Sequence, residues 1–462
     1  MSEMEQKPPT TAQRDVESVL RGHPYRAIVR LAWPATVAML LHTLFSITDA
    51  IWVGRLGAAP IAAVISCSFI IWILLSLTEV LSTGVVAMVA RAVGADDLDR
   101  ASVIVEQTFR FSLIYAVVVG LLGFLTRDRF FVLMDLAPDV QQLGSTYMAI
   151  YFIGAPFVVF TGWVSAVFRA AGNTRLPFLV HSVAIVLNVI LDPFLIFGIG
   201  PFPKWGVAGA AIATITAYVV GSIIAIVLLR QNRLPFPAPL RLLGKIDWQR
   251  MGRLIMIGLP ISISGIVFSV VYLFVNRITA QFGTASVAAL GIGNRIESIN
   301  YLISYGFSVA VATLVGQNLG ARNPQRAADL TRKTILLVTS FTGFMTVVFL
   351  LFPSAIMRIF VDDPAVLEAG KDYVRILALS QIMMGWEIVY EGAFSGAGNT
   401  LPPMIVAIPG AIMRIPLAWF LAVYMGLGVQ GVWWTITAST ILKGIVLFVW
   451  FSLGRWKHHD VS

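Results

Sequence analysis

The chain contains few charged residues and a single cysteine. Asp, Glu, Lys and Arg make up 12% of its 462 residues, whereas 58% are hydrophobic; soluble domains have about 25% charged residues. Cys67 is the only cysteine, so an intramolecular disulfide is excluded. The five histidines lack the His-Glu-x-x-His spacing of zinc enzymes, and there is no Walker sequence for ATP. Neither a zinc hydrolase nor an ATP-driven pump is therefore indicated.

Long apolar stretches are abundant instead. A stretch of 18 or more apolar residues crosses the roughly 30 Å of hydrocarbon in a bilayer, and the alternation typical of membrane strands is absent. The pattern predicts an all-α polytopic membrane protein with twelve transmembrane helices, six in each half. They are expected at 28–53, 60–88, 102–126, 143–168, 176–199, 207–229, 254–279, 286–314, 334–356, 374–395, 402–425 and 430–453.

The two halves are copies of one unit. Ala-Gly-Asn-Thr occurs at Ala171–Thr174 and again at Ala397–Thr400, an offset of 226 residues, and the same offset relates many other Gly, Pro and Ala positions. Near the end the offset falls to 222, which four extra residues in the loop around Pro201–Trp205 would explain. Small and turn-forming residues fix backbone shape and close helix packing. The repeat therefore predicts two six-helix lobes of the same fold, related by a pseudo-twofold axis along the membrane normal.

The net charge of +9 reflects membrane topology. With both termini in the cytosol, 21 of the 33 Lys and Arg residues fall on the cytosolic side and 7 on the opposite side, which is the positive-inside bias. We expect no nucleic-acid partner, and a multi-pass protein of the cytoplasmic (inner) membrane. The expected domains are a cytosolic tail (1–27), an N-terminal lobe (28–230), a cytosolic linker (231–253), a C-terminal lobe (254–453) and a cytosolic tail (454–462).

Two such lobes can enclose a cleft near the membrane midplane and rock about it, as alternating access requires. The alternative from the repeat alone is a duplicated scaffold that only oligomerises. Aromatic residues suited to lining a cleft for varied ligands are Trp72, Phe157, Tyr272, Tyr301 and Trp386.

Polar residues inside the N-terminal spans mark a candidate ion site, because such residues are costly there and usually functional. Asp49 lies in the first span, Asn188 and Asp192 lie one helical turn apart in the fifth, and Thr214 lies in the sixth. All lie within roughly 6–10 Å of the outer interface at 1.5 Å per residue. Taken singly, each has a structural explanation, such as a helix cap or an interhelical hydrogen bond. Together they suit a hard cation with oxygen ligands or a carried proton.

The second half carries different ionisable residues. At the repeat offset Asp49 corresponds to Val275, Asn188 to Arg414 and Asp192 to Ala418, so the cluster exists in one lobe only. Glu391 would pair across helices with Arg414 or Lys443, or else it would serve the substrate cleft. The candidates for a substrate-cleft or secondary role are Arg295, Glu297, Glu387 and Glu391.

Several motifs in combination resemble the MATE (multidrug and toxic compound extrusion) family. They are the run Pro34–Gly57, the loops VGADDLDRA and VGQNLGARNPQRA, both AGNT-x-x-P repeats, LNVILDPFLIF and GVAGAAIAT, in order over nearly the whole chain. The resemblance implies two six-helix lobes and export of organic cations or amphipathic compounds in exchange for H⁺ or Na⁺. It also implies a cation or proton site at Asp49, Asn188, Asp192 and Thr214, which would hold Na⁺ if sodium is the coupling ion, and a bending proline at Pro34.

The segment 254–279 lacks the acidic residue that NorM-like members carry in the seventh helix, so the chain looks closer to the DinF-like branch. We expect a monomeric secondary transporter of drug-like small molecules, surrounded by membrane lipids, with no cofactor other than the coupling ion H⁺ or Na⁺. The alternative is a flippase for lipid-linked oligosaccharides or lipids, whose cationic cleft would use Arg295, Arg414 and Lys443.

Overall fold

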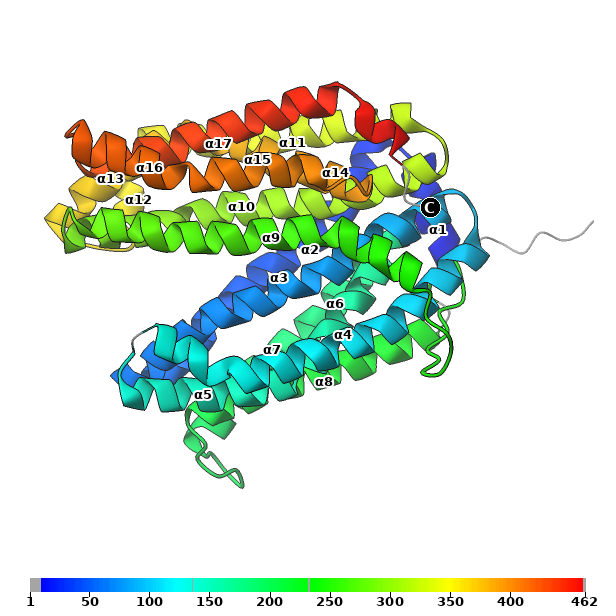
Figure 1. Cartoon of the computed structure of the whole chain (residues 1–462), viewed down its shortest axis with the longest axis horizontal. Coiled ribbons are helices and arrows are strands. Elements are labelled where there is room, and N and C mark those ends of the chain that lie inside the picture. Colours follow the sequence, from blue (N-terminus) through cyan, green and yellow to red (C-terminus); the bar gives the residue numbers. More distant parts are fainter. Residues whose placement is uncertain (1–9, 135, 232, 460–462) are drawn as a thin grey trace, which may run out of the picture. The chain divides into compact units, whose positions relative to one another are not determined.

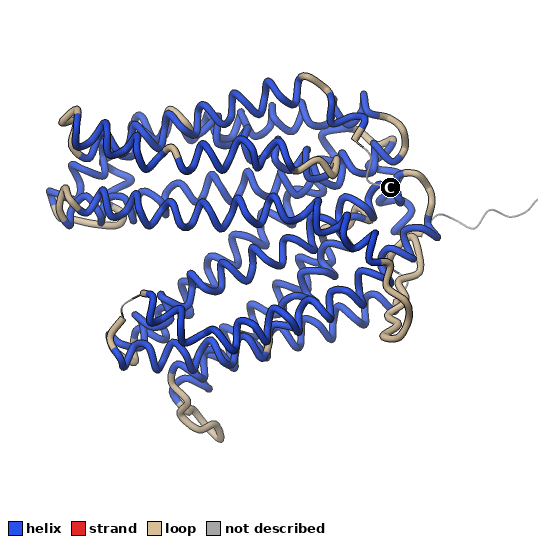
Figure 2. The backbone as a smooth tube through the Cα atoms, in the orientation of Figure 1, coloured by secondary structure: helices blue, strands red, loops and turns tan. Residues whose placement is uncertain are grey.

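The structure is a computed structural model that describes residues 10–134, 136–231 and 233–459. Every regular element in this part of the chain is a helix (Figures 1 and 2). The elements of the first half are α1 (Thr11–Leu20), α2 (Pro24–Gly54), α3 (Ala58–Gly94), α4 (Leu98–Leu133), α5 (Pro138–Ile153), α6 (Ala155–Ala170), α7 (Arg175–Phe197) and α8 (Val207–Arg230). Those of the second half are α9 (Trp248–Ala280), α10 (Thr284–Gly320), α11 (Pro324–Leu351), α12 (Pro353–Arg358), α13 (Pro364–Ala378), α14 (Gln381–Gly396), α15 (Leu401–Ile412), α16 (Arg414–Trp419), the π-helix η1 (Phe420–Tyr424), α17 (Val429–Ser452) and the 3₁₀-helix η2 (Arg455–His458).

The helices account for the predicted spans. Among the described residues ten helical segments are long and apolar enough to cross a membrane, with α15 to η1 counted as one segment. The pair α5 and α6, bent by 52° at Gly154, makes an eleventh. The place of the remaining predicted span, 374–395, is taken by α13 and α14, which have 15 and 16 residues and are each too short to be counted. The all-helical, multi-spanning fold class is confirmed.

The repeat extends to the ends of the helices. Adding 226 to the bounds of α3 gives those of α10. The same offset carries the first residue of α5 to that of α13 and the first residue of α6 to that of α14. Adding 222 to both bounds of α8 gives those of α17. The four extra residues therefore lie in the loop between α7 and α8, as the sequence predicted.

The turns are duplicated as well. Asp96 and Arg322 are equivalent in the repeat, and they are the only described residues other than glycine with positive φ, at 59° and 55°. Each is followed by a helix cap: the side chain of Asp97 accepts a hydrogen bond from the Arg100 amide, and that of Asn323 accepts one from the Arg326 amide. A short polar side chain at the N-cap satisfies an amide that the helix leaves free. One loop design thus starts α4 and α11.

Packing divides the chain into two compact units. Unit 1 contains residues 1–23, 37–256 and 316–322, and unit 2 contains 24–36, 257–315 and 323–462. Three short segments are thus counted with the other half: the start of α2, the linker with the start of α9, and the end of α10. In unit 1, α7 runs along α8 (Figure 1), and a core around the buried Cys67 and Phe131 includes residues of α2, α3, α5, α7 and α8.

The last turns of α3 and α10 meet in unit 1 through equivalent glycines. A Cβ atom at Gly94 would overlap the carbonyl oxygen of Gln317, and one at Gly320 would overlap that of Arg91. The side-chain amide of Gln317 also donates a hydrogen bond of 2.7 Å to the carbonyl of Ala170, at the end of α6. These glycines therefore allow two backbones to touch.

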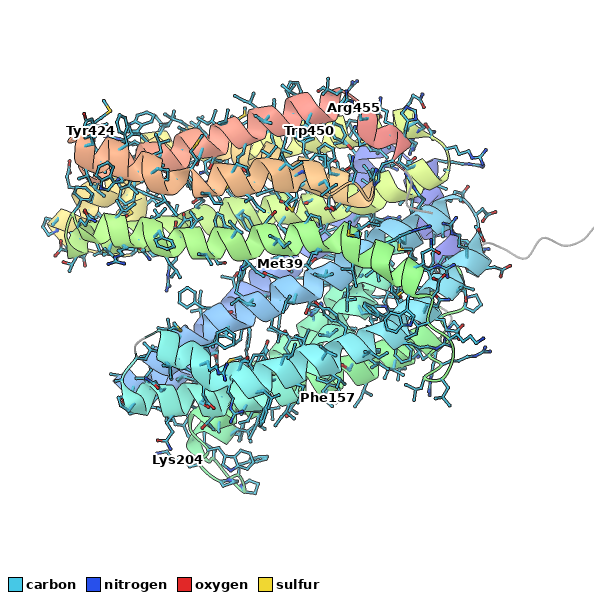
Figure 3. The ribbon with its side chains drawn as sticks, in the orientation of Figure 1. Met39, Phe157, Lys204, Tyr424, Trp450 and Arg455 are labelled. Carbon is cyan, nitrogen blue, oxygen red and sulfur yellow. The ribbon has the colours of Figure 1, made fainter. Side chains whose placement is uncertain are left out.

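The core of unit 2 includes residues of α9, α10, α13 and α17. The ring of Tyr373 stands edge-on to that of Trp433, with centroids 4.7 Å apart and planes at 90°, a favourable aromatic geometry. Tyr424, at the end of η1, and Arg455, after α17, lie at opposite ends of this unit (Figure 3).

Candidate functional site

The four predicted ligands of the N-terminal half lie on three helices of unit 1. Asp49 is on α2, Asn188 and Asp192 are on α7, and Thr214 is on α8. Their exposed fractions are 7%, 1%, 0% and 5%. A loop of eight residues, Gly198–Trp205 with Gly206 as the next N-cap, reverses the chain between α7 and α8, and this reversal brings the fifth and sixth spans side by side.

Two of the predicted ligands are in direct contact. The amide nitrogen Nδ2 of Asn188 donates a hydrogen bond of 3.1 Å to Oγ1 of Thr214. That hydroxyl in turn donates to the carbonyl of Ala210 at 3.0 Å, so its hydrogen is engaged and it faces Asn188 as an acceptor. This contact shows that Asn188 and Thr214, of the fifth and sixth predicted spans, lie at the same level along their helices.

Several buried oxygens of the group have no hydrogen-bond partner among the described residues. They are Oδ1 of Asp49, Oδ1 of Asn188 and both carboxylate oxygens of Asp192. Asp49 and Asp192 are close enough to interact electrostatically. Burying polar oxygens without partners is costly, and burying a charge without one is more so. The group therefore requires a proton, a cation or ordered water to complete it.

The local sequence explains how α7 presents these groups. Asn188 and Asp192 are four residues apart and so lie on one face of the helix. Pro193 lies inside α7, and the helix continues through it to Phe197. Because proline has no amide hydrogen, the carbonyl of Val189 loses its usual helical donor. Oxygen acceptors are thus concentrated on this stretch of α7.

Tyr147 on α5 was not predicted, yet it adjoins the site. It is 3% exposed, its hydroxyl interacts with Thr214, and it experiences the charges of Asp49 and Asp192. Its ring stacks on that of Tyr151, with centroids 6.3 Å apart. The phenol is both donor and acceptor, so it can move a hydrogen bond when the carboxylates change charge. A tyrosine in an apolar span gives no sequence signal of this kind.

Oxygen ligands in this number suit Na⁺ as well as a proton. Hard cations prefer carboxylate, amide and hydroxyl oxygens, which are the groups gathered here. Among the described residues no cluster of three or more His, Cys, Asp or Glu residues has metal-binding geometry.

Pro34 lies inside α2, which runs without a break from Pro24 to Gly54. The division between the two units falls two residues later, between Thr36 and Val37. Oγ1 of Thr36 is buried and has no hydrogen-bond partner in the described structure. The predicted conformational role of Pro34 stays a prediction. Pro34 lies close to the position at which α2 passes from one packing unit to the other.

The charged residues of unit 2 form a separate network. Nζ of Lys443 lies 2.6 Å from Oε1 of Glu387. Glu387 therefore forms an ion pair with Lys443 across two helices. Arg414 is 3% exposed; its Nε donates to Ser439 at 2.8 Å and an Nη donates to Thr440 at 3.0 Å.

The other candidates of unit 2 are less closely connected. Glu297, on α10, interacts electrostatically with Arg414 and Lys443 and forms side-chain contacts with Gln381 and Tyr373. Glu391 contributes to the field at Lys443. Arg295 is exposed. The predicted pairing of Glu391 with Arg414 or Lys443 stays a prediction, while Arg414 donates hydrogen bonds to two hydroxyl groups.

The proposed cleft aromatics fall into two groups. Tyr272 donates to Asn294 at 3.0 Å and Trp386 donates to Thr339 at 2.7 Å, so both are tied into the packing of unit 2. Trp72, Tyr301 and Phe157 are 48%, 39% and 39% exposed. Phe157 belongs to α6 and is labelled in Figure 3. The rings of these three residues are partly accessible, and their predicted role in lining a cleft stays a prediction.

Comparison with known proteins gives consistent matches over the full chain. The MatE family model matches twice, over residues 34–194 and 260–420. The chain is 28% identical to "Probable multidrug resistance protein NorM" of Thermotoga maritima, over 94% of each protein. It is 25% identical to "FAD transporter" of Shewanella oneidensis, over 94% of this chain and 96% of that protein.

Two solved structures described as MATE in the straight and in the bent conformation also resemble it, each at 25% identity. The TM-scores are 0.88 and 0.89, and the matches cover 98% and 97% of this chain and 100% and 98% of theirs. A NorM name on a similar relative does not assign a branch, and α9 has no acidic residue, so the DinF-like branch stays a prediction. Because the family model matches both halves of the repeat, this chain belongs to the MatE family, whose members are membrane transporters and not enzymes.

Proposed function

We propose that the chain is a secondary active efflux transporter that exports organic cations or other amphipathic drug-like compounds in exchange for H⁺ or Na⁺. The observation that carries the coupling is the pair Asp49 and Asp192, buried together with acceptor oxygens that no described residue satisfies. Relatives named for multidrug resistance support the substrate class.

The coupling follows from electrostatics. When the ion leaves, two interacting carboxylates stay behind in a poorly hydrated site, and this state is unfavourable unless water reaches them or a conformational change relieves them. An ion shifts a conformational equilibrium only through its different affinity for the two states, at about 1.4 kcal/mol for each tenfold change. Loading Asp49 and Asp192 would therefore favour one orientation of the transporter, and release would favour the other.

The same ligands serve either ion. A proton would neutralise one carboxylate and give it a hydrogen to donate. Na⁺ would be held by the oxygens of Asp49, Asn188, Asp192 and Thr214, with the Asn188–Thr214 hydrogen bond fixing the orientation of the amide. In both cases the ion is cargo and the protein needs no further cofactor.

The proposed setting is the cytoplasmic (inner) membrane, with both termini and the linker on the cytosolic side, as the distribution of Lys and Arg favours. The first and last residues of the chain lie outside the described residues. We propose that the monomer is the working unit, since each chain carries both halves of the repeat and its own candidate ion site.

Transport by purified protein in liposomes tests this function. Protein-containing vesicles loaded with a fluorescent cationic drug are given a pH gradient or a sodium gradient, one at a time. We expect drug movement against its gradient with one of the two ions, and none when both gradients are absent. Movement that continues equally without any ion gradient would contradict antiport. Movement of a labelled lipid in place of the drug would favour the flippase alternative.

A further inference from the structure

The segment between α8 and α9 is folded against unit 1. Leu234 and Phe236 are 6% and 3% exposed, although they lie in a loop rich in proline. The ring of Trp248, the first residue of α9, stands edge-on to that of Phe111 on α4, with centroids 6.3 Å apart. The linker therefore follows the side of α4 and is not a free tether.

The side chain of Arg110, on α4, holds this segment through hydrogen bonds to the backbone of the segment. Its Nε donates to the carbonyl of Arg241 at 3.0 Å, and Nη1 donates to that of Lys245 at 3.2 Å. The guanidinium also pairs with Glu106 one turn earlier. Gly244 has φ +147°, and a Cβ atom there would overlap the guanidinium carbon. One buried arginine thus fixes both ends of the loop 241–245.

The exposed side chains of the loop 241–245 are apolar at its tip and basic at its two ends. Leu243 is 89% exposed, the highest fraction among the exposed large apolar side chains of the described residues, and Leu242 is 70% exposed. Neither belongs to a membrane-spanning helix, so lipid contact along a span does not account for them. The side chains of Arg241 and Lys245 are exposed as well.

The level of the loop along α4 indicates its surroundings. Arg110 is the last charged residue before the run Phe111–Thr126, which contains no Asp, Glu, Lys or Arg. Although the expected span begins at 102, the uncharged part of α4 begins directly after Arg110, and we infer that the hydrocarbon begins there. A loop held at that level places two leucines beside the boundary between headgroups and acyl chains, where apolar tips with basic flanks bind.

We propose that the loop Arg241–Lys245 is an interfacial anchor that inserts Leu242 and Leu243 into the adjacent leaflet while Arg241 and Lys245 bind the phosphates of anionic lipid headgroups. Exposed leucines gain by leaving water, and basic residues near a membrane surface are attracted to anionic lipid. Arg110 is a positioning residue, because it touches the loop backbone and not the lipid. The inference rests on the membrane-spanning fold and is independent of ion coupling.

Depth measurement by spin labelling tests the anchor in the intact protein. In a Cys67→Ala background, Leu243→Cys carries a nitroxide, and the protein is placed in nanodiscs of phosphatidylcholine with one quarter phosphatidylglycerol. Matched labels are Val117→Cys, exposed within the apolar run of α4, and Asp99→Cys, exposed in its first turn about 16 Å before Arg110. The readout is the accessibility of each label to oxygen relative to a water-soluble nickel chelate.

We expect the label at 243 to favour oxygen over nickel by at least about threefold more than the label at Asp99, and to approach the label at Val117. A label at 243 as open to nickel as the one at Asp99 would overturn insertion. In pure phosphatidylcholine the insertion should weaken, and Arg241→Gln/Lys245→Gln should remove that lipid dependence. Equal depth in both lipids would overturn the assignment of headgroup binding to these two residues.

A second pair of variants tests the positioning role of Arg110. Arg110→Gln/Glu106→Gln removes the guanidinium without leaving a lone carboxylate, and we expect the spectrum at 243 to sharpen as the loop becomes mobile. Glu106→Gln alone keeps both hydrogen bonds to the loop and should leave the spectrum broad. A spectrum that is equally broad in the double variant would show that Leu234 and Phe236 alone hold the loop.

Discussion

The hydrogen bond between Asn188 and Thr214 is the contact that gives the candidate site a fixed shape. An asparagine amide can turn over and exchange its oxygen for its nitrogen, and donation to Thr214 selects the orientation in which Oδ1 stays free. A purely structural role, in which these two residues only join α7 to α8, explains the hydrogen bond but not the two adjoining carboxylates. Asp192 has both oxygens unpartnered within the described structure, which a purely structural role does not require.

Thr214→Val should therefore weaken ion binding more than it weakens the fold. Valine has nearly the same shape and lacks the acceptor, so the Asn188 amide loses a partner at a cost of about 1 kcal/mol. Thr216→Val on the same helix is the matched control, because Thr216 bonds only to the Ile212 carbonyl in the described structure. We expect a shift in the coupling-ion concentration for half-maximal transport of about fivefold in Thr214→Val. The same shift in the control would contradict the assignment.

How much of the site the sequence predicts differs from residue to residue. Asp49, Asn188, Asp192 and Thr214 are predictable because polar residues are rare in spans and their depths agree. Tyr147 is not, since its position depends on how α5 packs. The sequence predicted Arg414 or Lys443 as a partner for Glu391, but not the ion pair between Lys443 and Glu387, because that pair depends on side-chain direction on α14.

At the scale of helices, the repeated loops and the helix bounds follow from local chemistry. Glycine and proline signals recur at a constant offset, and the expected spans at 207–229 and 430–453 begin within one residue of α8 and α17. The helices α4 and α11 begin earlier than the expected spans 102–126 and 334–356, because their first turns are polar. The bend between α5 and α6, and the replacement of one apolar span by α13 and α14, could not be predicted from the sequence. Both features depend on how these helices pack against their neighbours, and a count of apolar residues along the sequence does not contain that information.

Gly94→Ala should be strongly destabilising, because its new methyl group would overlap the Gln317 carbonyl where α3 meets α10. We expect a loss of more than about 2 kcal/mol, as for overpacked or displaced backbone. Gly252→Ala on α9 is the control: nothing lies within 4 Å of its Cβ position, and alanine is the better helix former. Thermal unfolding in detergent separates the two. Similar midpoints for both variants would contradict the backbone contact.

Pro34→Ala should slow transport more than it weakens substrate binding. Proline removes the amide that would bond the carbonyl of Arg30, so α2 can change curvature at this point, next to the residue where its packing partners change. Alanine restores the helical hydrogen bond. Transport rate in liposomes and drug affinity in detergent are measured on the same preparation. Equal losses in both would indicate a purely structural proline.

For the whole molecule, the repeat predicts a common fold and the asymmetry of its polar residues predicts divided roles. The linker and the α7–α8 loop must lie on opposite sides of the membrane, since α8 connects them. In the Cys67→Ala background, Asp99→Cys should react with a membrane-impermeant maleimide only in inside-out vesicles, and Lys204→Cys, on the loop shown in Figure 3, only in intact cells. The reverse pattern would overturn the proposed orientation.

Ion dependence in liposomes, compared between two double variants, tests the proposed coupling most directly. Asp49→Asn/Asp192→Asn removes both carboxylates of the candidate site and replaces them with groups of the same shape. Glu387→Gln/Lys443→Gln removes an ion pair of unit 2 without leaving a lone buried charge. We expect the first variant to lose about 100-fold in ion-driven drug transport, about 2.7 kcal/mol, while the second keeps the ion dependence and changes which drugs are carried. Loss of ion dependence in the second variant with full coupling in the first would place the coupling site in the other half of the chain.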